Sequence, residues 1–364
     1  MFAPDEYRDR LGRLRAEMAA AGAKLAVVDH GELLAYLTGF TISETRYRAC
    51  LVPLEGEPWC VLRSLDVPPC RERTWIREVI GFPDWADPVA FIAETVAARG
   101  HAGSVIAVDD DSYSFTARTA ERWRDALPGA RFVTLTGIGD RLRRRKSAAE
   151  IELLSRAADV ADGVMEALQC SVEPGWTARQ AAALAASEAL RRGADTGDVG
   201  PVLKATGDSG FLHGHLVDDP LQPGDVLHVE LVPKVLGYCA RIMRPIVVGA
   251  PSVRLVDMAS AIIKVQDAQF AAMRPGASAA AVDAVMRDGL RAQGLRSDYD
   301  NVTGYQLGLY ARTPRVSDFS LCFHPGAEWT LEEGMVFHMY TSAAGLAFSD
   351  TILVTAAGGR RLTR

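Results

Sequence analysis

A segment of this sequence recurs once, and this recurrence constrains the fold more than any other feature. Pro174-Gly175-Trp176-Thr177 opens a helix-like run that ends near Gly193, and Pro275-Gly276-Ala277-Ser278 opens a second run that ends near Gly294. The two copies lie 101 residues apart at both ends. A long helix-like segment precedes each copy and strand-like segments follow it, so the pattern predicts an α+β domain of two similar halves around a pseudo-two-fold axis. A binding site is expected between such halves.

The domain of two halves begins near residue 146. The composition becomes sharply basic from Arg141 to Lys146. Ser147 and Glu150 then form a capping box, in which each side chain satisfies a free backbone N–H at the start of a helix. We therefore expect a first domain at residues 1–145 and the α+β domain at residues 146–364.

The first 145 residues alternate between helix-like and strand-like runs, which is typical of an α/β domain. The expected helices cover residues 5–22, 88–99 and 114–127, and the expected strands cover residues 24–28, 33–37, 49–53 and 104–108.

Charge and hydropathy narrow the choice of partner and compartment. A formal net charge of -6 speaks against a nucleic-acid-binding protein, which usually needs a basic face. No run approaches about 18 consecutive apolar residues, so we expect no membrane span. The acidic start at residues 1–6 is unlike a signal peptide. We therefore expect a cytoplasmic protein whose partner is a small molecule.

The six cysteines predict no metal site of their own, because none belongs to a Cys-x-x-Cys pair. Cys50, Cys60 and Cys70 follow one another at roughly ten-residue spacing. Disulfide bonds among them are the less favoured alternative, and buried free thiols in a reducing compartment are the expected state.

An ordered series of motifs resembles the creatinase/prolidase/methionine-aminopeptidase family, whose catalytic domain has the pita-bread fold. The series covers nearly the whole chain and consists of Tyr36-Leu37-Thr38-Gly39-Phe40 at an expected strand end, Lys146-Ser147 with Glu150-Ile151, Gly224-Asp225-Val226, Gly237-Tyr238, Gly334-Met335-Val336-Phe337 and Asp350-Thr351-Ile352-Leu353-Val354-Thr355. The resemblance implies a creatinase-type α/β domain at residues 1–145 and a pita-bread catalytic domain at residues 146–364. It also implies a homodimer, because N-terminal domains of this family commonly cover the partner's active-site mouth.

Metallopeptidases of this family hold two metal ions with two Asp, one His and two Glu side chains. By motif position these five places fall on Glu230, Arg241, Tyr305, Tyr340 and Ser349. One carboxylate facing a guanidinium, two phenols and a hydroxyl cannot bind hard divalent cations. The resemblance therefore implies the metal-free branch of the family, with no metal and no other cofactor.

Within that branch the motifs are closest to those of ectoine hydrolase and creatinase. The likeness rests on Glu230, on Gly304-Tyr305-x-x-Gly308, on Phe337-His338 and on His213 in Phe211-Leu212-His213-Gly214. The chain departs from the ectoine hydrolase pattern at Arg312-Thr313-Pro314-Arg315.

Two of these residues are the expected catalytic pair. His213 matches the histidine that gives and takes the proton in metal-free members, and a histidine titrates near neutral pH. Glu230 lies among apolar neighbours on an expected strand at residues 226–232, where a carboxylate is rarely buried unless it is paired or functional. It is expected to act as a nucleophile or a base.

The other candidates are expected to bind substrate. Arg241 either binds a substrate carboxylate or pairs with Glu230, and binding is the favoured role. The further substrate-binding candidates are Tyr305, Tyr340, His338, Ser349 and His215. His228 shares a strand face with Glu230 and is a lesser candidate.

The sequence thus predicts a metal-independent hydrolase, not an aminopeptidase, that cleaves a non-peptide C–N bond in a small zwitterionic amidine, guanidine or cyclic amide. Two alternatives stay open. One is a lyase, isomerase or cyclase that uses the same acid–base pair. The other is an inactive binding module, which would favour apolar filler where this chain has polar side chains.

Overall fold

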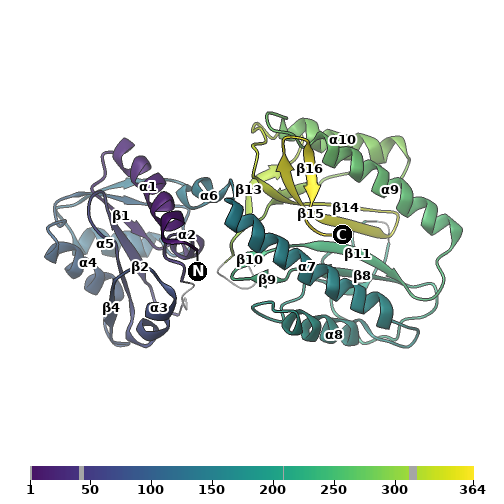
Figure 1. Ribbon diagram of the computed structural model, residues 1–364, viewed down its shortest axis with the longest axis horizontal. Helices are drawn as coiled ribbons and strands as arrows, with labels where there is room; N and C mark the ends of the chain where they lie inside the picture. Colours follow the sequence, from purple (N-terminus) through teal and green to yellow (C-terminus); the bar gives the residue numbers. More distant parts are fainter. Residues whose placement is uncertain (1, 41–44, 208, 311–317) are drawn as a thin grey trace. The chain divides into compact units, whose positions relative to one another are not determined.

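A computed structural model describes residues 2–40, 45–207, 209–310 and 318–364. The expected departure at residues 312–315 therefore lies outside the described residues. The chain divides into two compact units, the first ending at Arg143 and the second starting at Arg144 (Figure 1). No helix among the described residues is long and apolar enough to cross a membrane.

The first unit contains a six-stranded sheet in the order β4-β3-β2-β1-β5-β6. Its strands are β1 (Leu25–Val28), β2 (Ala49–Pro53), β3 (Trp59–Arg63), β4 (Glu78–Phe82), β5 (Val105–Val108) and β6 (Arg131–Thr134). Its helices are α1 (Pro4–Ala20), α2 (Gly31–Thr38), the 3-10 turn η1 (Ser64–Asp66), α3 (Val67–Arg73), α4 (Pro88–Ala98), α5 (Ala117–Ala126) and α6 (Ile138–Arg143). Parallel and antiparallel pairs both occur, as in many α/β sheets.

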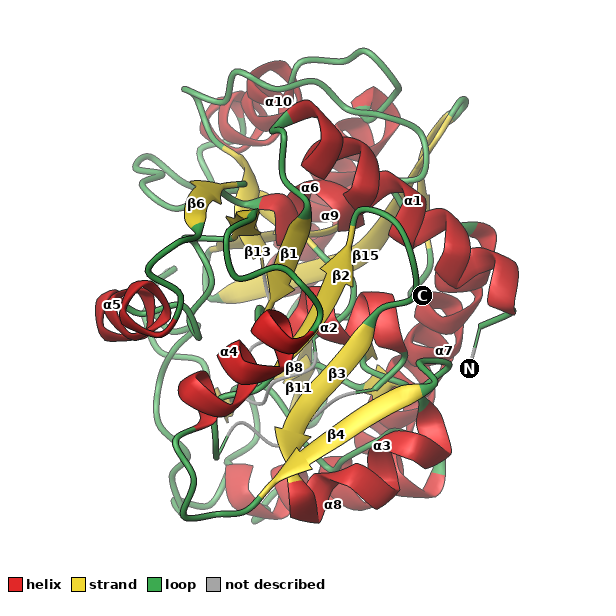
Figure 2. Cartoon of the chain, turned by 90° about the vertical axis from the view of Figure 1, so that its left-hand side faces the viewer, coloured by secondary structure: helices red, strands yellow, loops and turns green. Residues whose placement is uncertain are grey.

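Helices α4 and α5 cover one face of this sheet. Ile92 of α4 and Trp123 of α5 are fully buried in a core with Val27, Leu51 and Val61 of the strands. Figure 2 shows α4 in front of β2 and β3. The predicted N-terminal α/β domain is therefore confirmed as a sheet with helices packed on it.

One expected strand of this unit is wrong. Residues 33–37 form part of α2, and the motif at residues 36–40 lies at a helix end. The side chain of His30 caps the first turn, and Gly39 ends the helix with a left-handed φ of 78°. Every residue from Glu32 to Thr38 is buried, so the apolar run carries no period that separates a buried helix from a buried strand.

The second unit contains an eight-stranded sheet in the order β13-β12-β14-β15-β11-β8-β7, with β16 paired to β15. Its strands are β7 (Val202–Lys204), β8 (Val226–Leu231), β11 (Ile242–Val247), β12 (Gly304–Gln306), β13 (Asp318–Phe323), β14 (Val336–Ala343), β15 (Leu346–Thr355) and β16 (Gly358–Arg361), and β9 (Lys234–Val235) pairs with β10 (Tyr238–Cys239) apart from them. Its helices are α7 (Ala148–Ser171), α8 (Ala178–Arg191), α9 (Val253–Ala272) and α10 (Ala279–Ala292).

The predicted repeat is present in this unit. Helices α8 and α10 each have 14 residues and begin 101 positions apart. The glycine before each helix makes the same contact in both halves: Gly175 N–H donates to the carbonyl of Leu221, and Gly276 N–H donates to that of Leu331, each at 2.8 Å. The two halves therefore share a local hydrogen-bond pattern, as a pseudo-two-fold fold requires.

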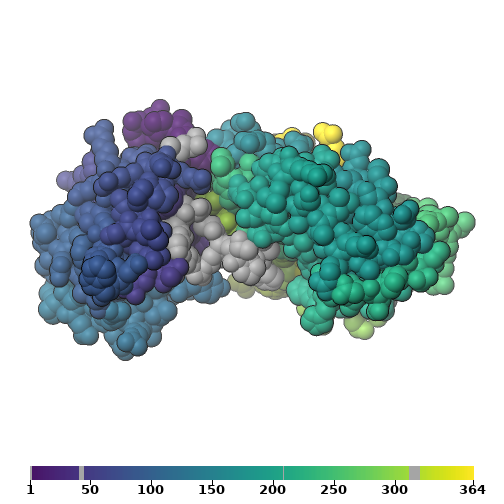
Figure 3. Space-filling model, turned by 90° about the horizontal axis from the view of Figure 1, so that it is seen from below, coloured from purple at the N-terminus to yellow at the C-terminus, as the bar shows by residue number. Residues whose placement is uncertain are grey.

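The helices of the second unit lie in pairs, α7 with α8 and α9 with α10. In the view of Figure 1, α9 and α10 lie nearer the top of this unit and α7 and α8 lie nearer the bottom. Figure 3 shows the teal surface of this unit that α7 and α8 contribute. The capping box of Ser147 and Glu150 begins α7, as predicted.

The six cysteines are free thiols, and all but the exposed Cys170 are buried. Cys50 and Cys60 are directly opposed in β2 and β3. The hydrogen bond with Cys60 is the main cause of the raised pKa of the Cys70 thiol, and burial is the second cause. The expectation of buried free thiols is confirmed for five of the six.

Candidate functional site

The expected site residues of the second unit's strands share one face of its sheet. Residues directly opposed in an antiparallel pair place their side chains on the same face. One row across β8, β11, β15 and β14 consists of Glu230, Met243, Ser349 and Tyr340. The next row across β15, β14 and β12 consists of Thr351, His338 and Tyr305. We call this surface of the sheet the site face.

The opposite face of the same strands packs against helices. Phe337, Met339 and Ile352 lie in a core with Phe270 of α9 and Val282 of α10. Because side chains alternate along a strand, their neighbours in β14 and β15 point away from α9 and α10. This alternation places the polar residues of both rows on the site face.

A buried ion pair lies at the centre of the site face. The guanidinium of Arg241 donates to a carboxylate oxygen of Glu230, and the two residues are 8% and 1% exposed. Burial is the largest influence and acts to lower the pKa of Arg241. The charge of Glu230, smaller contributions from Tyr305 and Cys239, and the hydrogen bond with Glu230 together outweigh burial, so the pKa is raised and Arg241 stays charged. Pairing with Glu230 is thus the role that Arg241 has in this structure.

The aromatic candidates gather beside this pair. The guanidinium carbon of Arg241 lies 5.3 Å from the ring centroid of Tyr305, a cation–π distance. The Tyr305 hydroxyl lies 2.9 Å from Nδ1 of His338, and the His338 ring stacks on that of Tyr340 at 5.2 Å. Burial, helped by the charge of Arg241, holds the pKa of His338 well below its usual range, so this imidazole is neutral.

The two phenols are also uncharged. Burial raises the pKa of Tyr305 well above its usual value and raises that of Tyr340. The site face therefore combines a charge-balanced ion pair with neutral rings, and it offers hydrogen bonds without net charge.

Polar atoms of the site face lack a hydrogen-bond partner among the described residues. Two of them are Nε2 of His338 and Oγ of Ser349, both fully buried, and the ring nitrogens of His228 on the same face also have no partner among the described residues. An unsatisfied buried polar atom costs about 1–3 kcal/mol. Such atoms are expected where a protein holds hydrogen-bonding capacity in reserve for a ligand.

The two loop histidines lie at the surface between β7 and β8. His213 and His215 are both exposed, and no hydrogen bond joins either one to Glu230 or Arg241 in the described part of the chain. His213 belongs to a turn closed by a 3.0 Å hydrogen bond from Gly214 N–H to the carbonyl of Phe211. The structure therefore brings six of the eight expected site residues onto one face and leaves these two on a flanking loop.

Three residues that sequence reasoning did not place in the site support it. The hydroxyl of Thr351 accepts from Arg241 N–H at 2.8 Å and donates to the Arg241 carbonyl at 2.9 Å. The side chain of Asn301 donates to the Tyr340 hydroxyl at 3.3 Å. A Cβ at Gly200 would lie 2.9 Å from Glu230 Cγ, so the chain before β7 packs directly on the methylene groups of the Glu230 side chain. Thr351 stood within a recognised motif, and the other two carried no signal.

The residues at the expected metal positions do not fit a metal ion. Among the described residues, no group of three or more His, Cys, Asp or Glu side chains is arranged to hold one. Glu230 is the one carboxylate of the five positions, and its charge is already compensated by Arg241. A divalent cation needs several anionic or imidazole ligands, which this face does not provide.

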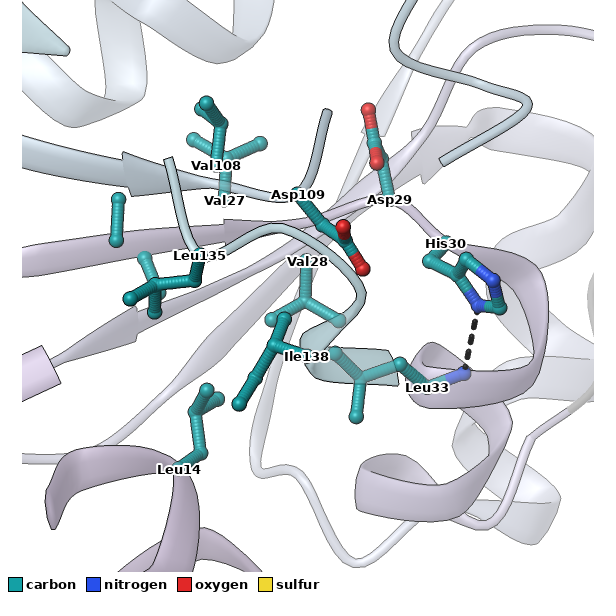
Figure 4. A pocket seen from close by; sticks show the side chains of 12 residues that line it. Leu14, Val27, Val28, Asp29, His30, Leu33, Val108, Asp109, Leu135 and Ile138 are labelled. Atoms are coloured by element: carbon teal, nitrogen blue, oxygen red, sulfur yellow. Dashed lines mark hydrogen bonds between the residues drawn. The ribbon is translucent and has the colours of Figure 1, made fainter. Parts of the chain in front are cut away.

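A separate small cavity lies inside the first unit. Figure 4 shows Asp29, His30 and Asp109 at one side of it and apolar side chains such as Val28 and Leu135 at the other. Its volume is about 10 Å³, room for about one water molecule. It is far too small for a metabolite, so the site face is the stronger candidate.

Comparison with known proteins agrees with this architecture. The model of metallopeptidase family M24 matches residues 152–356, and that of the creatinase/prolidase N-terminal domain matches residues 10–145. The chain is 25% identical to the ectoine hydrolase of Halomonas elongata, over 98% of this chain and 95% of that one. It is 29% identical to PepE of Mycobacterium tuberculosis, a probable dipeptidase, over 98% and 94%.

Solved structures show the same two-domain fold. The dipeptidase PepE from Mycobacterium ulcerans has a TM-score of 0.79 at 28% identity and covers 100% of this chain and 97% of its own. An Xaa-Pro dipeptidase from Bacillus anthracis has a TM-score of 0.82 at 21% identity, with 98% of both chains covered. The chain therefore belongs to metallopeptidase family M24 and carries the creatinase/prolidase N-terminal domain ahead of its pita-bread domain.

Proposed function

We propose that this member of the family is a metal-independent hydrolase that cleaves a non-peptide C–N bond in a small zwitterionic amidine, guanidine or cyclic amide. The observation that carries the proposal is the buried pair of Glu230 and Arg241 at the centre of the site face. By motif position the pair corresponds to two of the family's metal ligands, and here it combines a carboxylate with a guanidinium beside two phenols and a neutral imidazole.

A zwitterionic substrate suits this pair. Separating a buried ion pair without compensation is costly, because each charge loses its partner in a medium that solvates it poorly. An amidinium placed on Glu230 and a carboxylate placed on Arg241 replace one ion pair by two. A guanidinium also binds a carboxylate through two parallel hydrogen bonds, which orients the substrate.

The proposed chemistry needs a nucleophile and a proton donor. Glu230, freed from Arg241 by the substrate, attacks the central carbon or removes a proton from a water that attacks it. His213 gives a proton to the departing nitrogen, and water supplies the hydroxyl group of the product. Tyr305 or Tyr340 donates a hydrogen bond to the charge that develops in the intermediate.

The relatives favour two substrate classes. Similarity to an ectoine hydrolase supports cleavage of a non-peptide C–N bond. Similarity to proteins named as dipeptidases favours peptide cleavage as the second candidate function. The residue types at the metal positions favour the first, because metal-assisted peptide hydrolysis depends on a set of ligands that the described residues do not bring together.

The test is a substrate panel for the purified chain with and without chelator. It contains amidines, guanidino acids, cyclic amidines and dipeptides, and mass spectrometry identifies the products. The proposal expects chelator-insensitive addition of water to a non-peptide substrate, with turnover largely abolished by Glu230→Gln and by His213→Ala. Dipeptide cleavage that requires added metal would replace it with the second candidate. A product isomeric with the substrate would identify an isomerase or a cyclase.

A further inference from the structure

His228 is a buried histidine that the proposed mechanism does not use. It lies on β8, two residues before Glu230, and is 1% exposed. Residues two apart on a strand share a face, and their Cα atoms are about 7 Å apart. His228 therefore projects from the site face next to the buried ion pair.

Both ring nitrogens of His228 lack a hydrogen-bond partner among the described residues. This is unusual for a buried histidine, since a structural one normally satisfies at least one nitrogen. His30 illustrates the ordinary case, because its Nδ1 accepts from the backbone N–H of Leu33 at 3.3 Å. Burial, with a smaller contribution from the charge of His213, lowers the pKa of His228 to about 4. The ring is therefore neutral, with one nitrogen that donates and one that accepts.

The loop that carries His213 rests on His228. The ring of Phe211 meets the His228 ring edge-on, with centroids 5.4 Å apart. Leu203 of β7 is directly opposed to His228 of β8. A Cβ on Gly214 would lie 3.1 Å from the side chain of Leu203. Both ends of the Phe211–Gly214 turn thus contact the site face at the level of His228. This contact brings His213 to the same side of the sheet as Glu230.

We propose that His228 is a ligand-binding residue of this site, which contacts an amide- or amidine-type group of the ligand through a ring nitrogen beneath the His213 turn. The inference rests on the proposed function for the class of ligand. A neutral imidazole both donates and accepts, so it can bind the N–H edge of an amidine or the carbonyl of an amide. His228 shares its strand face with the expected nucleophile and lies under the loop that carries the expected proton donor, so a ligand that reaches both passes close to its ring.

The first test measures melting temperature with a matched pair of variants in the full chain. His228→Leu removes two ring nitrogens that have no partner, so it is expected to melt at or above the wild-type temperature. His30→Leu removes a partnered imidazole of similar burial and is expected to melt several degrees lower. A loss in His228→Leu as large as that in His30→Leu would mean that His228 is a structural residue, and would overturn the proposal.

The second test follows the histidine ring nitrogens by NMR in the full chain with labelled histidine. The chain has seven histidines, and His228→Gln identifies the His228 signal by its loss. The probes are acetamidine, guanidinoacetate and the dipeptide Gly-Pro. At least one is expected to shift the His228 signal saturably and to bind about tenfold more weakly to His228→Leu, which corresponds to the loss of one hydrogen bond.

Two polar replacements then identify the nitrogen involved. His228→Asn keeps a polar group near Nδ1 and His228→Gln keeps one near Nε2, so one of them is expected to retain most of the affinity. A His228 signal that none of the probes moves would refute the inference. A probe that binds at His228 without being hydrolysed would leave the inference intact and sink the proposed function. Hydrolysis with an unchanged KM in His228→Leu would do the reverse.

Discussion

Replacing Arg241 by methionine leaves the carboxylate of Glu230 buried without its cation. Glu230 is 1% exposed and Arg241 is 8% exposed, so solvent cannot take over the role of the guanidinium. Breaking a buried ion pair on one side costs about 3–5 kcal/mol. In a unit of this size each kcal/mol lowers the melting temperature by about 2–4 °C. We therefore expect Arg241→Met to lower the melting temperature of the second unit by about 10 °C.

Two comparisons separate this effect from a general loss of contacts. Glu230→Leu combined with Arg241→Met removes both charges, and its stability is expected to return close to that of the wild type. Arg179→Met breaks a pair with Asp218 in which the side chains are 57% and 66% exposed, and it is expected to leave the melting temperature close to that of the wild type.

Calorimetry on the full chain measures these differences, and urea unfolding checks that the denaturant slope stays constant. An Arg241→Met variant within about 1 kcal/mol of the wild type would refute the reasoning. It would mean that the pair is not desolvated or that Arg241 does not neutralise Glu230. Arg241→Lys then tests recognition, because it keeps the charge and loses the two-pronged contact with a carboxylate. If Arg241 binds a substrate carboxylate, Arg241→Lys is expected to raise KM strongly, and esterified substrate analogues are expected to bind weakly to the wild type.

Three further predictions concern metal, assembly and pH. Elemental analysis is expected to find no stoichiometric transition metal, and about one Mn, Fe, Co or Zn ion per chain with chelator-sensitive activity would contradict this. Light scattering is expected to give a homodimer, and a mass near 39.3 kDa at micromolar concentration would count against it. Burial raises the pKa of Asp29 from 3.8 to about 6, so the folded first unit binds this proton more tightly than the unfolded chain does. The free energy of unfolding of this unit is therefore expected to fall by up to about 3 kcal/mol as the pH rises from about 4 to 6. Asp29→Asn should abolish that difference, and a stability gap between variant and wild type that is constant over this range would disprove it.

The repeat was the part of the fold that sequence could predict most completely. The residues that mark the repeat lie next to its helices. Gly175 has a left-handed φ of 91° and Gly276 one of 83°, and each lies just before a helix. Each signal lies within a few residues of the element that it predicts. The prediction for the buried helix α2 was wrong because its interior is almost uniformly apolar and carries no helical period. Only His30 and Gly39 at its ends mark it as a helix.

The site was predictable only as far as strand alternation reaches. Motif positions gave the candidate residues, and a period of two placed His228 on the same face of its strand as Glu230, but only the pairing of β8, β11, β15 and β14 brings Glu230 and Tyr340 onto one face. The absence of hydrogen-bond partners for His228, however, depends on which side chains of β7 and of the loop before β8 pack against its ring. Contacts of that kind join residues distant in sequence, and no local pattern encodes them.

The pair at the centre of the site face shows why substitutions at metal positions have to be interpreted together. Taken singly, Arg241 in place of an acid removes a ligand and Glu230 keeps one. A carboxylate that is 1% exposed, however, stays ionised only where a partner compensates its charge, and a metal ion or a guanidinium can be that partner through its positive charge. Arg241 supplies this charge permanently, because its pKa is raised by Glu230 and it cannot be titrated away. A substrate carboxylate can share the guanidinium with Glu230 or displace Glu230 from it. A face that exchanges a metal for an arginine therefore keeps its buried acid and gains a contact that a zwitterion can compete for.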